Sequence, residues 1–124
     1  KSLLQKIISI NPDLIILAGF LLKIPAIFVN AFPKKIINIH PALLPKFGGR
    51  GMYGNRVHQS VKDSSEEKTG ITIHFVNEFF DQGTIIFQAS VLIDDTDTVE
   101  DIANKVHKLE YAHYPRIIDQ LLFS

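Results

Sequence analysis

Two polar side chains stand at the end of an aliphatic run, in the segment Asn38-Ile39-His40-Pro41. If the run is a strand, residues 38 and 40 share one face because side chains alternate along a strand. They also lie at its carboxyl end, where open α/β sheets bind ligands. One interpretation is a functional pair. The alternative is that both side chains only bind the proline-rich loop that follows and close the strand.

A carboxylate that could serve this pair lies farther along, at Asp81 in the segment Glu78-Phe79-Phe80-Asp81-Gln82-Gly83. An Asp in a turn before Gly commonly serves turn geometry alone. The alternative comes from topology, because the loop leaves a strand that we expect to neighbour the strand of Asn38 and His40. A carboxylate placed there could face the imidazole, which is the pairing that orients and charges a catalytic histidine.

Two further motifs contain residue types that could bind a cofactor or a metal, but their context argues against such sites. The glycines between Gly49 and Gly54 match a dinucleotide fingerprint in form, but no strand leads directly into them, so we reject a nicotinamide site. On the last helix, His107 and His113 are separated by about 120° of rotation, which disfavours joint ligation of a metal. A polar stripe is the expected role there, and Glu110 alone could reach a ligand.

Composition excludes several classes of function. The 124 residues carry 13 basic and 13 acidic side chains, a net charge of +0, which disfavours binding to nucleic acid through phosphate neutralisation. No cysteine is present, so disulfides, thiol nucleophiles and Cys-ligated metals are excluded. No apolar run reaches the ~18–20 residues that span a bilayer. We therefore expect a cytoplasmic location and no membrane partner.

The spacing of apolar residues predicts the elements that position these groups. A helix over residues 2–10, a strand over 14–18, a helix over 25–31 and a strand over 35–39 form a parallel βαβ unit. A long loop and a helix over 53–60 follow. Strands over 69–76 and 84–93 form an antiparallel pair. A final helix starts at Asp97 or Thr98, and Pro115 is expected to kink or split it. No repeat or linker divides the chain, which predicts a single domain over residues 1–124.

Four segments together resemble a known family. They are Leu17-Ala18-Gly19-Phe20, then Asn38-Ile39-His40-Pro41-Ala42-Leu43-Leu44-Pro45, then His74-Phe75-Val76 with Asp81-Gln82-Gly83, and finally Glu110-Tyr111-Ala112-His113-Tyr114-Pro115. In order and spacing, the chain resembles the phosphoribosylglycinamide formyltransferases, within the folate-dependent formyltransferase superfamily. The resemblance implies an α/β, Rossmann-like fold, with a mostly parallel sheet flanked by helices and an antiparallel strand pair towards the C-terminus.

The resemblance also implies roles for individual residues. Asn38, His40 and Asp81 match the catalytic residues of the family. The folate-enclosing positions match Leu17, Gly19, Leu22, Ile24, His74 and Asn77, and the positions bordering the nucleotide substrate match Phe20, Leu21 and Glu110. Many relatives carry Arg where Leu22 stands. The family's phosphate loop precedes the first of these segments and has no counterpart in the 124 residues, so the chain is expected to be a C-terminal portion of a formyltransferase domain.

The reaction that the resemblance implies is formyl transfer from 10-formyltetrahydrofolate, as co-substrate, to the amine of glycinamide ribonucleotide, a step of purine biosynthesis. No metal is expected to take part. Asn38 and a protonated His40 would stabilise a tetrahedral oxyanion, while Asp81 keeps His40 charged. Two alternatives stay open: another folate formyl enzyme, such as methionyl-tRNA formyltransferase or formyltetrahydrofolate deformylase, and a non-catalytic ligand-binding domain of the same fold.

Overall fold

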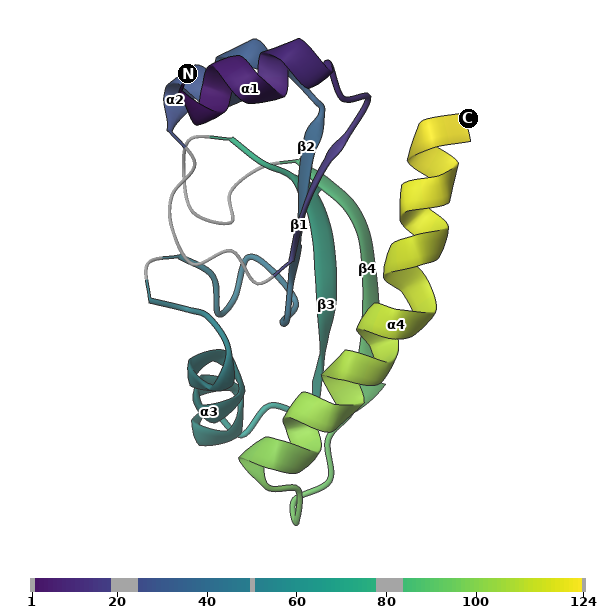
Figure 1. Ribbon diagram of the computed structural model, residues 1–124. Helices are drawn as coiled ribbons and strands as arrows, with labels where there is room; N and C mark the ends of the chain where they lie inside the picture. The colour runs from purple at the N-terminus through teal and green to yellow at the C-terminus, as the bar shows by residue number, and fades with distance from the viewer. Residues whose placement is uncertain (1, 19–24, 50, 78–83, 124) are drawn as a thin grey trace.

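The computed structural model describes residues 2–18, 25–49, 51–77 and 84–123 of the chain. Within these ranges, one sheet of four strands has helices along its face and at its ends (Figure 1). The strand order is β1-β2-β3-β4, which is also the order along the chain. Its elements are α1 (Leu3–Ile10), β1 (Ile15–Ala18), α2 (Ala26–Ala31), β2 (Ile36–His40), α3 (Asn55–Asp63), β3 (Lys68–Phe75), β4 (Ile85–Leu92) and α4 (Val99–Phe123).

The first half of the described chain confirms the predicted βαβ unit. β1 and β2 pair in parallel, with Leu17 beside Asn38, and α2 connects them in sequence. The N-cap of α1 is a reciprocal capping box, in which the Ser2 hydroxyl accepts from the Gln5 backbone and the Gln5 side chain accepts from the Ser2 backbone. The sequence predicted Pro25 as the first residue of α2, but the structure places it one position earlier, at the N-cap. β2 extends one residue farther than predicted, so His40 belongs to the strand itself.

The second half of the sheet is antiparallel. β3 pairs with β2 and with β4 in antiparallel registers, which confirms the predicted pair formed by residues 69–76 and 84–93. It also confirms that the strand before Asp81 neighbours the strand of Asn38 and His40. Of the three strand pairings among the described residues, one is parallel and two are antiparallel.

A hydrophobic core forms where α4 packs along one face of the sheet (Figure 1). Its buried members are Ile37, Ile39, Ile71 and Ile73 from the strands, together with Val106, Tyr114 and Ile117 from α4. The helix runs unbroken through Pro115, so the predicted split does not occur. Tyr114 and Ile117, on either side of the proline, are both buried against the sheet, which holds the two halves of the helix on one surface.

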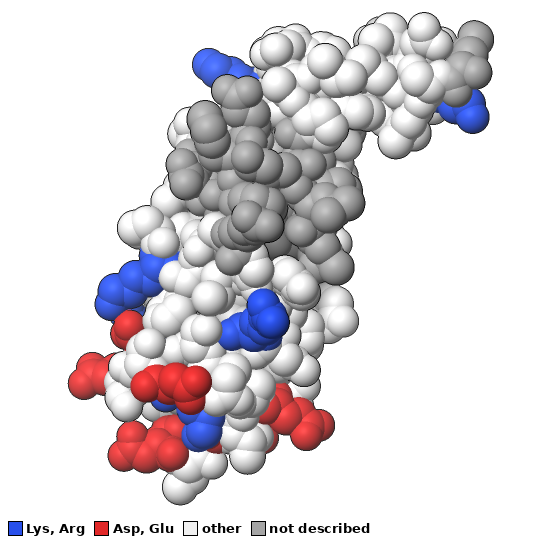
Figure 2. All heavy atoms as spheres, turned by 90° about the vertical axis from the view of Figure 1, so that its left-hand side faces the viewer, with Lys and Arg blue, Asp and Glu red and all other residues white. Residues whose placement is uncertain are grey.

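The surface differs between the two ends of the molecule. On the face shown in Figure 2, acidic side chains gather at the end that bears α3, and none is visible at the end that bears α1 and α2. Several large apolar side chains of α1 and α2 are exposed instead, among them Leu3, Ile8, Ile10 and Ile27. Among the helices that the structure describes, none is long and apolar enough to cross a membrane.

Candidate functional site

The site begins with the alternation of side chains along β2. Ile37 and Ile39 point into the core beneath α4, so Asn38 and His40 lie on the opposite face of the sheet. Both polar residues are buried, with exposed fractions of 9% for Asn38 and 3% for His40. The predicted same-face pair is therefore present, and it is shielded from bulk water.

β3 adds two more polar side chains to this face. Its antiparallel register places His74 directly opposite Asn38, and Thr72 directly opposite His40. Directly opposed side chains in such a pair share a face and lie within contact range. The structure thus places His74, a predicted folate-binding residue, beside Asn38. Thr72 was not predicted, although Thr72 and His74 repeat the two-residue polar spacing of Asn38 and His40, a signal that could have found it.

The loop after β2 holds the His40 ring. His40 Nε2 lies 2.7 Å from the carbonyl oxygen of Phe47. A carbonyl oxygen only accepts, so Nε2 carries a proton and donates it. The ring is thereby oriented by a residue seven positions farther along the chain.

Thr72 fastens the same loop to the sheet. Its hydroxyl donates to the Ala42 carbonyl oxygen at 2.7 Å and accepts from the Leu44 backbone N–H at 3.0 Å. Gln88 on β4 donates to the Thr72 hydroxyl at 2.9 Å and to the Leu44 carbonyl oxygen at 3.0 Å. The hydroxyl therefore uses its donor and both of its acceptor positions, at full burial. This network connects β3 and β4 to the loop that carries Phe47.

Asn38 has an acceptor that the described residues leave unused. Its Oδ1 is buried and has no hydrogen-bond partner among them. A buried amide oxygen without a donor costs free energy, on the order of 1–3 kcal/mol. An N–H group of a bound molecule would satisfy it. The site can therefore accept a hydrogen bond from an amine or amide of a ligand.

At the end of β1, α4 reaches the predicted folate-binding residue Leu17. The Tyr114 hydroxyl donates to the Leu17 carbonyl oxygen at 2.6 Å, which joins residues 97 positions apart. Burial raises the pKa of Tyr114, and the negative charge of Glu110 raises it further. The Tyr114 hydroxyl thus stays protonated and anchors β1. Sequence reasoning included Tyr114 in the family segment but assigned it no role.

The remaining predicted residues divide into those with a described environment and those without. Glu110, predicted at the nucleotide substrate, contacts His107 on its own helix, with Oε1 2.7 Å from Nδ1. Asn77 is half-buried just beyond the end of β3. The other predicted site residues lie outside the described residues: Gly19, Phe20, Leu21, Leu22, Ile24 and Asp81.

The histidine stripe of α4 has local partners. His107 pairs with Glu110, whereas His113 Nδ1 lies 3.0 Å from the Arg116 guanidinium and its ring packs beside Phe87. In the part of the chain that the structure describes, no group of three or more His, Asp or Glu side chains is arranged to hold a metal ion.

Comparison with known proteins shows what this arrangement is similar to. A family model described as formyl transferase matches residues 1–118. A chloroplastic phosphoribosylglycinamide formyltransferase of Arabidopsis thaliana is 48% identical over 106 residues, covering 86% of this chain and 36% of the relative. The Bacillus subtilis phosphoribosylglycinamide formyltransferase is 44% identical over 110 residues, covering 89% of this chain and 54% of the relative.

A solved structure shows the same similarity as the related sequences. The crystal structure of the phosphoribosylglycinamide formyltransferase from Bacillus halodurans superposes with a TM-score of 0.87 at 32% identity, over 97% of this chain and 59% of that one. The chain thus spans between about a third and about three fifths of the length of these relatives. The family model matches nearly the whole length of this chain, and the chain shares its fold with the Bacillus halodurans structure. The chain therefore belongs to the formyl transferase family.

Proposed function

We propose that this chain supplies catalytic residues for formyl transfer from 10-formyltetrahydrofolate to the amine of glycinamide ribonucleotide. The observation that carries the proposal is the buried pair Asn38 and His40, side by side on one sheet face at the end of β2. Its support is the similarity to proteins named phosphoribosylglycinamide formyltransferase. The same similarity supports a role in purine biosynthesis.

The chemistry is an acyl transfer between two nitrogens. The substrate amine attacks the formyl carbon, and the electron pair of the C=O bond moves to the oxygen. The tetrahedral intermediate carries a negative oxygen and a positive nitrogen. The attacking nitrogen then loses a proton, the oxyanion re-forms the C=O bond as the bond between carbon and the folate nitrogen breaks, and the folate nitrogen takes up a proton. Donors aimed at the developing oxyanion stabilise the step by about 3–4 kcal/mol each.

Asn38 and His40 suit this step in different ways. The Asn38 amide can donate from Nδ2 to the oxyanion, while its buried Oδ1 can accept from the attacking amine. An imidazolium donates from both ring nitrogens, and in this structure the Nε2 proton of His40 is held by the Phe47 carbonyl. We propose that Asp81 favours the charged form of His40 and receives the amine proton through water.

Two of the proposed binding residues lie beside Asn38 on the neighbouring strands. His74 lies opposite Asn38 on β3, Leu17 lies beside Asn38 on β1, and Asn77 follows β3. We propose that these three enclose the folate together with Gly19, Leu22 and Ile24, and that Phe20, Leu21 and Glu110 border the nucleotide substrate. Burial of Asn38 and His40 excludes water, which strengthens hydrogen bonds to a developing charge.

The test is a formyl transfer assay on the full-length protein with both substrates. We expect turnover in the wild type, and a fall in kcat of about 10²–10³-fold in Asn38→Ala and in His40→Asn. His113→Asn is the matched control, because His113 lies on α4 beside Phe87 and has no proposed role, so we expect a near-normal kcat. Formate release that needs no nucleotide would instead indicate a deformylase. Absence of both reactions in a protein that binds a folate analogue would favour a ligand-binding domain.

A further inference from the structure

The loop that follows β2 carries the carbonyl group that orients His40. His40 Nε2 donates to the Phe47 carbonyl oxygen at 2.7 Å, so the backbone path up to Phe47 decides where this ring nitrogen points. Because the imidazole is rigid and planar, holding one ring nitrogen also fixes the direction of the other. A donor to an oxyanion is effective only if it is aimed before the reaction starts. The groups that hold this loop therefore bear on the proposed reaction.

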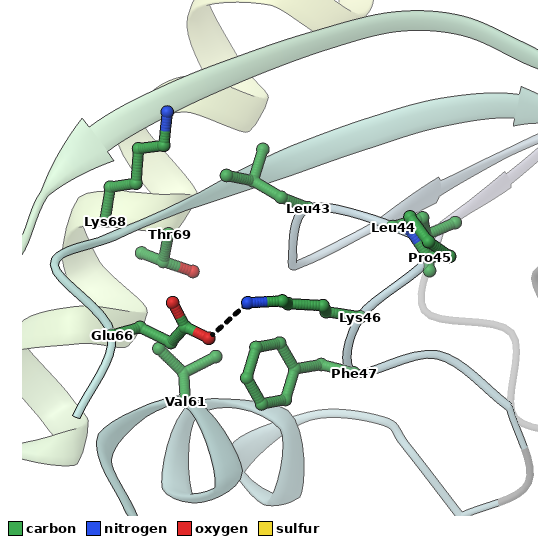
Figure 3. Close-up of a pocket in the computed structure, with 9 residues that line it drawn as sticks. All are labelled: Leu43, Leu44, Pro45, Lys46, Phe47, Val61, Glu66, Lys68 and Thr69. Carbon is green, nitrogen blue, oxygen red and sulfur yellow. Dashed lines mark hydrogen bonds and ion pairs between the residues drawn. The ribbon is translucent and has the colours of Figure 1, made fainter. Parts of the chain in front are cut away.

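Phe47 has a backbone conformation that its surroundings must enforce. Its φ is 59°, in the left-handed region that bulky residues rarely adopt. Such a conformation persists only where neighbouring structure imposes it. The Phe47 ring packs against Val57 and Val61 of α3, and Figure 3 shows it beside Val61. This contact fixes the side chain, but the carbonyl group belongs to the backbone and needs an anchor of its own.

Leu44 provides a backbone anchor, because side chains from two strands hold both of its backbone polar groups. Its N–H donates to the Thr72 hydroxyl at 3.0 Å, and its carbonyl oxygen accepts from Gln88 Nε2 at 3.0 Å. Only two residues, a proline and a lysine, separate Leu44 from Phe47 (Figure 3). The proline ring fixes one of the few backbone dihedrals between them. The direction of the Phe47 carbonyl therefore depends on the position of Leu44.

The ion pair next to Phe47 is a weaker anchor. Lys46 Nζ lies 3.0 Å from Glu66 Oε1 (Figure 3), but the Lys46 side chain is 68% exposed. Exposed ion pairs contribute little, because water screens the charges and the long side chains lose conformational freedom. The hydrogen bonds at Leu44 are thus the stronger restraint on this part of the loop.

Gln88 completes the anchor from β4. Its Nε2 carries two protons, and it has two acceptors, the Leu44 carbonyl oxygen and the Thr72 hydroxyl oxygen at 2.9 Å. The hydroxyl already accepts from the Leu44 N–H, so Gln88 fills its second acceptor position and directs the hydroxyl proton to the Ala42 carbonyl oxygen. One side-chain amide therefore holds the Leu44 carbonyl and orients the hydroxyl that holds the Leu44 N–H.

We propose that Gln88 is a positioning residue for His40, which acts through Leu44 and the carbonyl group of Phe47. The strand registers place Thr72 opposite both His40 and Gln88, so the three side chains share one face of the sheet. Gln88 is exposed and lies outside the buried core, so its substitution leaves the packing of the fold in place. Its effect on turnover rests on the proposed function, whereas its effect on the ring does not.

The first experiment records nitrogen NMR spectra of the His40 ring in the full-length protein at alkaline pH, where the imidazole is neutral. We expect the wild type to hold its proton on Nε2, as the contact with Phe47 requires. Gln88→Met keeps a similar side-chain length without a donor, and both tautomers should then be populated. Ser90→Ala, two residues farther along β4, is the matched control and should retain the wild-type spectrum. An unchanged spectrum in Gln88→Met would overturn the proposal.

The second experiment measures formyl transfer by the same proteins. In Gln88→Met, kcat should fall about tenfold, because a donor that is no longer aimed loses part of its effect. The KM of each substrate should change by less than about twofold, since the lost restraint acts in the transition state. Ser90→Ala should keep both parameters. A higher KM at constant kcat would show that Gln88 binds a substrate, and would contradict a positioning role.

Thr72→Val tests whether the two side chains act through the same loop. If both act through Leu44, adding Gln88→Met to Thr72→Val should lower kcat by no more than about twofold further. Losses that multiply would contradict the shared route. If Gln88→Met changes the His40 spectrum in a protein without formyl transfer, the proposed function fails and the positioning of His40 by Gln88 stands.

Discussion

His40 Nε2 donates a hydrogen bond to the carbonyl oxygen of Phe47 across 2.7 Å. The bond links the end of β2 to the loop that leaves it, and it assigns a proton to Nε2 whatever the charge of the ring. Phe47 in turn sits on a loop that Thr72 and Gln88 tie to β3 and β4. The orientation of the imidazole therefore depends on residues from three strands.

The charge of His40 is the subject of the first prediction. A histidine has an ordinary pKa of about 6.5, and a nearby carboxylate favours its charged form. If Asp81 has this role, Asp81→Asn lowers the imidazolium fraction at pH 7.5, and kcat falls by about 10²–10³-fold. Part of the activity should return as the pH is lowered, because protonation replaces the lost stabilisation. The measurement is the pH profile of kcat, with folate-analogue affinity as the control, and a near-normal kcat would leave Asp81 as a turn residue.

Thr72 provides a test of the loop network. Thr72→Val keeps the volume and removes the hydroxyl, which leaves the Leu44 N–H and the Ala42 carbonyl without their buried partner. We expect the free energy of unfolding to fall by about 1–3 kcal/mol. Thr72→Ser restores the hydroxyl and should recover most of this loss. Urea unfolding of the three proteins measures it, and equal stabilities would show that the network contributes nothing.

Gly70 is predicted to tolerate no side chain. A Cβ at this position would lie 1.9 Å from the Ala89 carbonyl oxygen and 2.8 Å from Leu43 Cδ2. The first neighbour is backbone of the paired strand β4 and cannot yield without separating the strands. Gly70→Ala should lower the free energy of unfolding by about 3 kcal/mol. The matched control is Gly49→Ala, where no atom lies within 4 Å of the added Cβ and only the positive φ opposes it. A stable Gly70→Ala protein in thermal unfolding would refute the close approach.

His58 on α3 sets an expected pH dependence of stability. Its Nδ1 is buried without a partner among the described residues. Burial, then the charges of His107 and His40, lower its pKa from 6.5 to about 4. The unfolded state therefore binds its proton first as the pH falls, so stability is complete above pH 6.5 and declines towards pH 4.

The decline attributable to His58 should be on the order of 2–3 kcal/mol. His58→Gln removes the titrating group and should flatten the stability curve over this range. Urea unfolding of the wild type and the variant at several pH values between 4 and 7 measures the difference. Parallel curves for the two proteins would show that folding leaves the pKa of His58 unchanged.

Local sequence patterns were sufficient to predict the helices and strands, and to predict that Asn38 and His40 form a pair. The aliphatic runs predicted β1 and β2, and the two-residue period of a strand placed Asn38 and His40 on one face before any tertiary contact was known. The glycine and proline content after Pro41 predicted a long loop there. These inferences succeed because side-chain direction in a strand depends only on neighbouring residues.

The partners of that pair came from the tertiary structure alone. Antiparallel pairing of β2 with β3 brings His74 opposite Asn38 and Thr72 opposite His40, and no local pattern specifies that register. The path of the loop decides that the Phe47 carbonyl meets the His40 ring. The contact of Tyr114 with Leu17 joins positions 97 residues apart. Long-range register and loop path depend on how the whole core packs, so the sequence determined which residues share a strand face, and the fold decided what each of them touches.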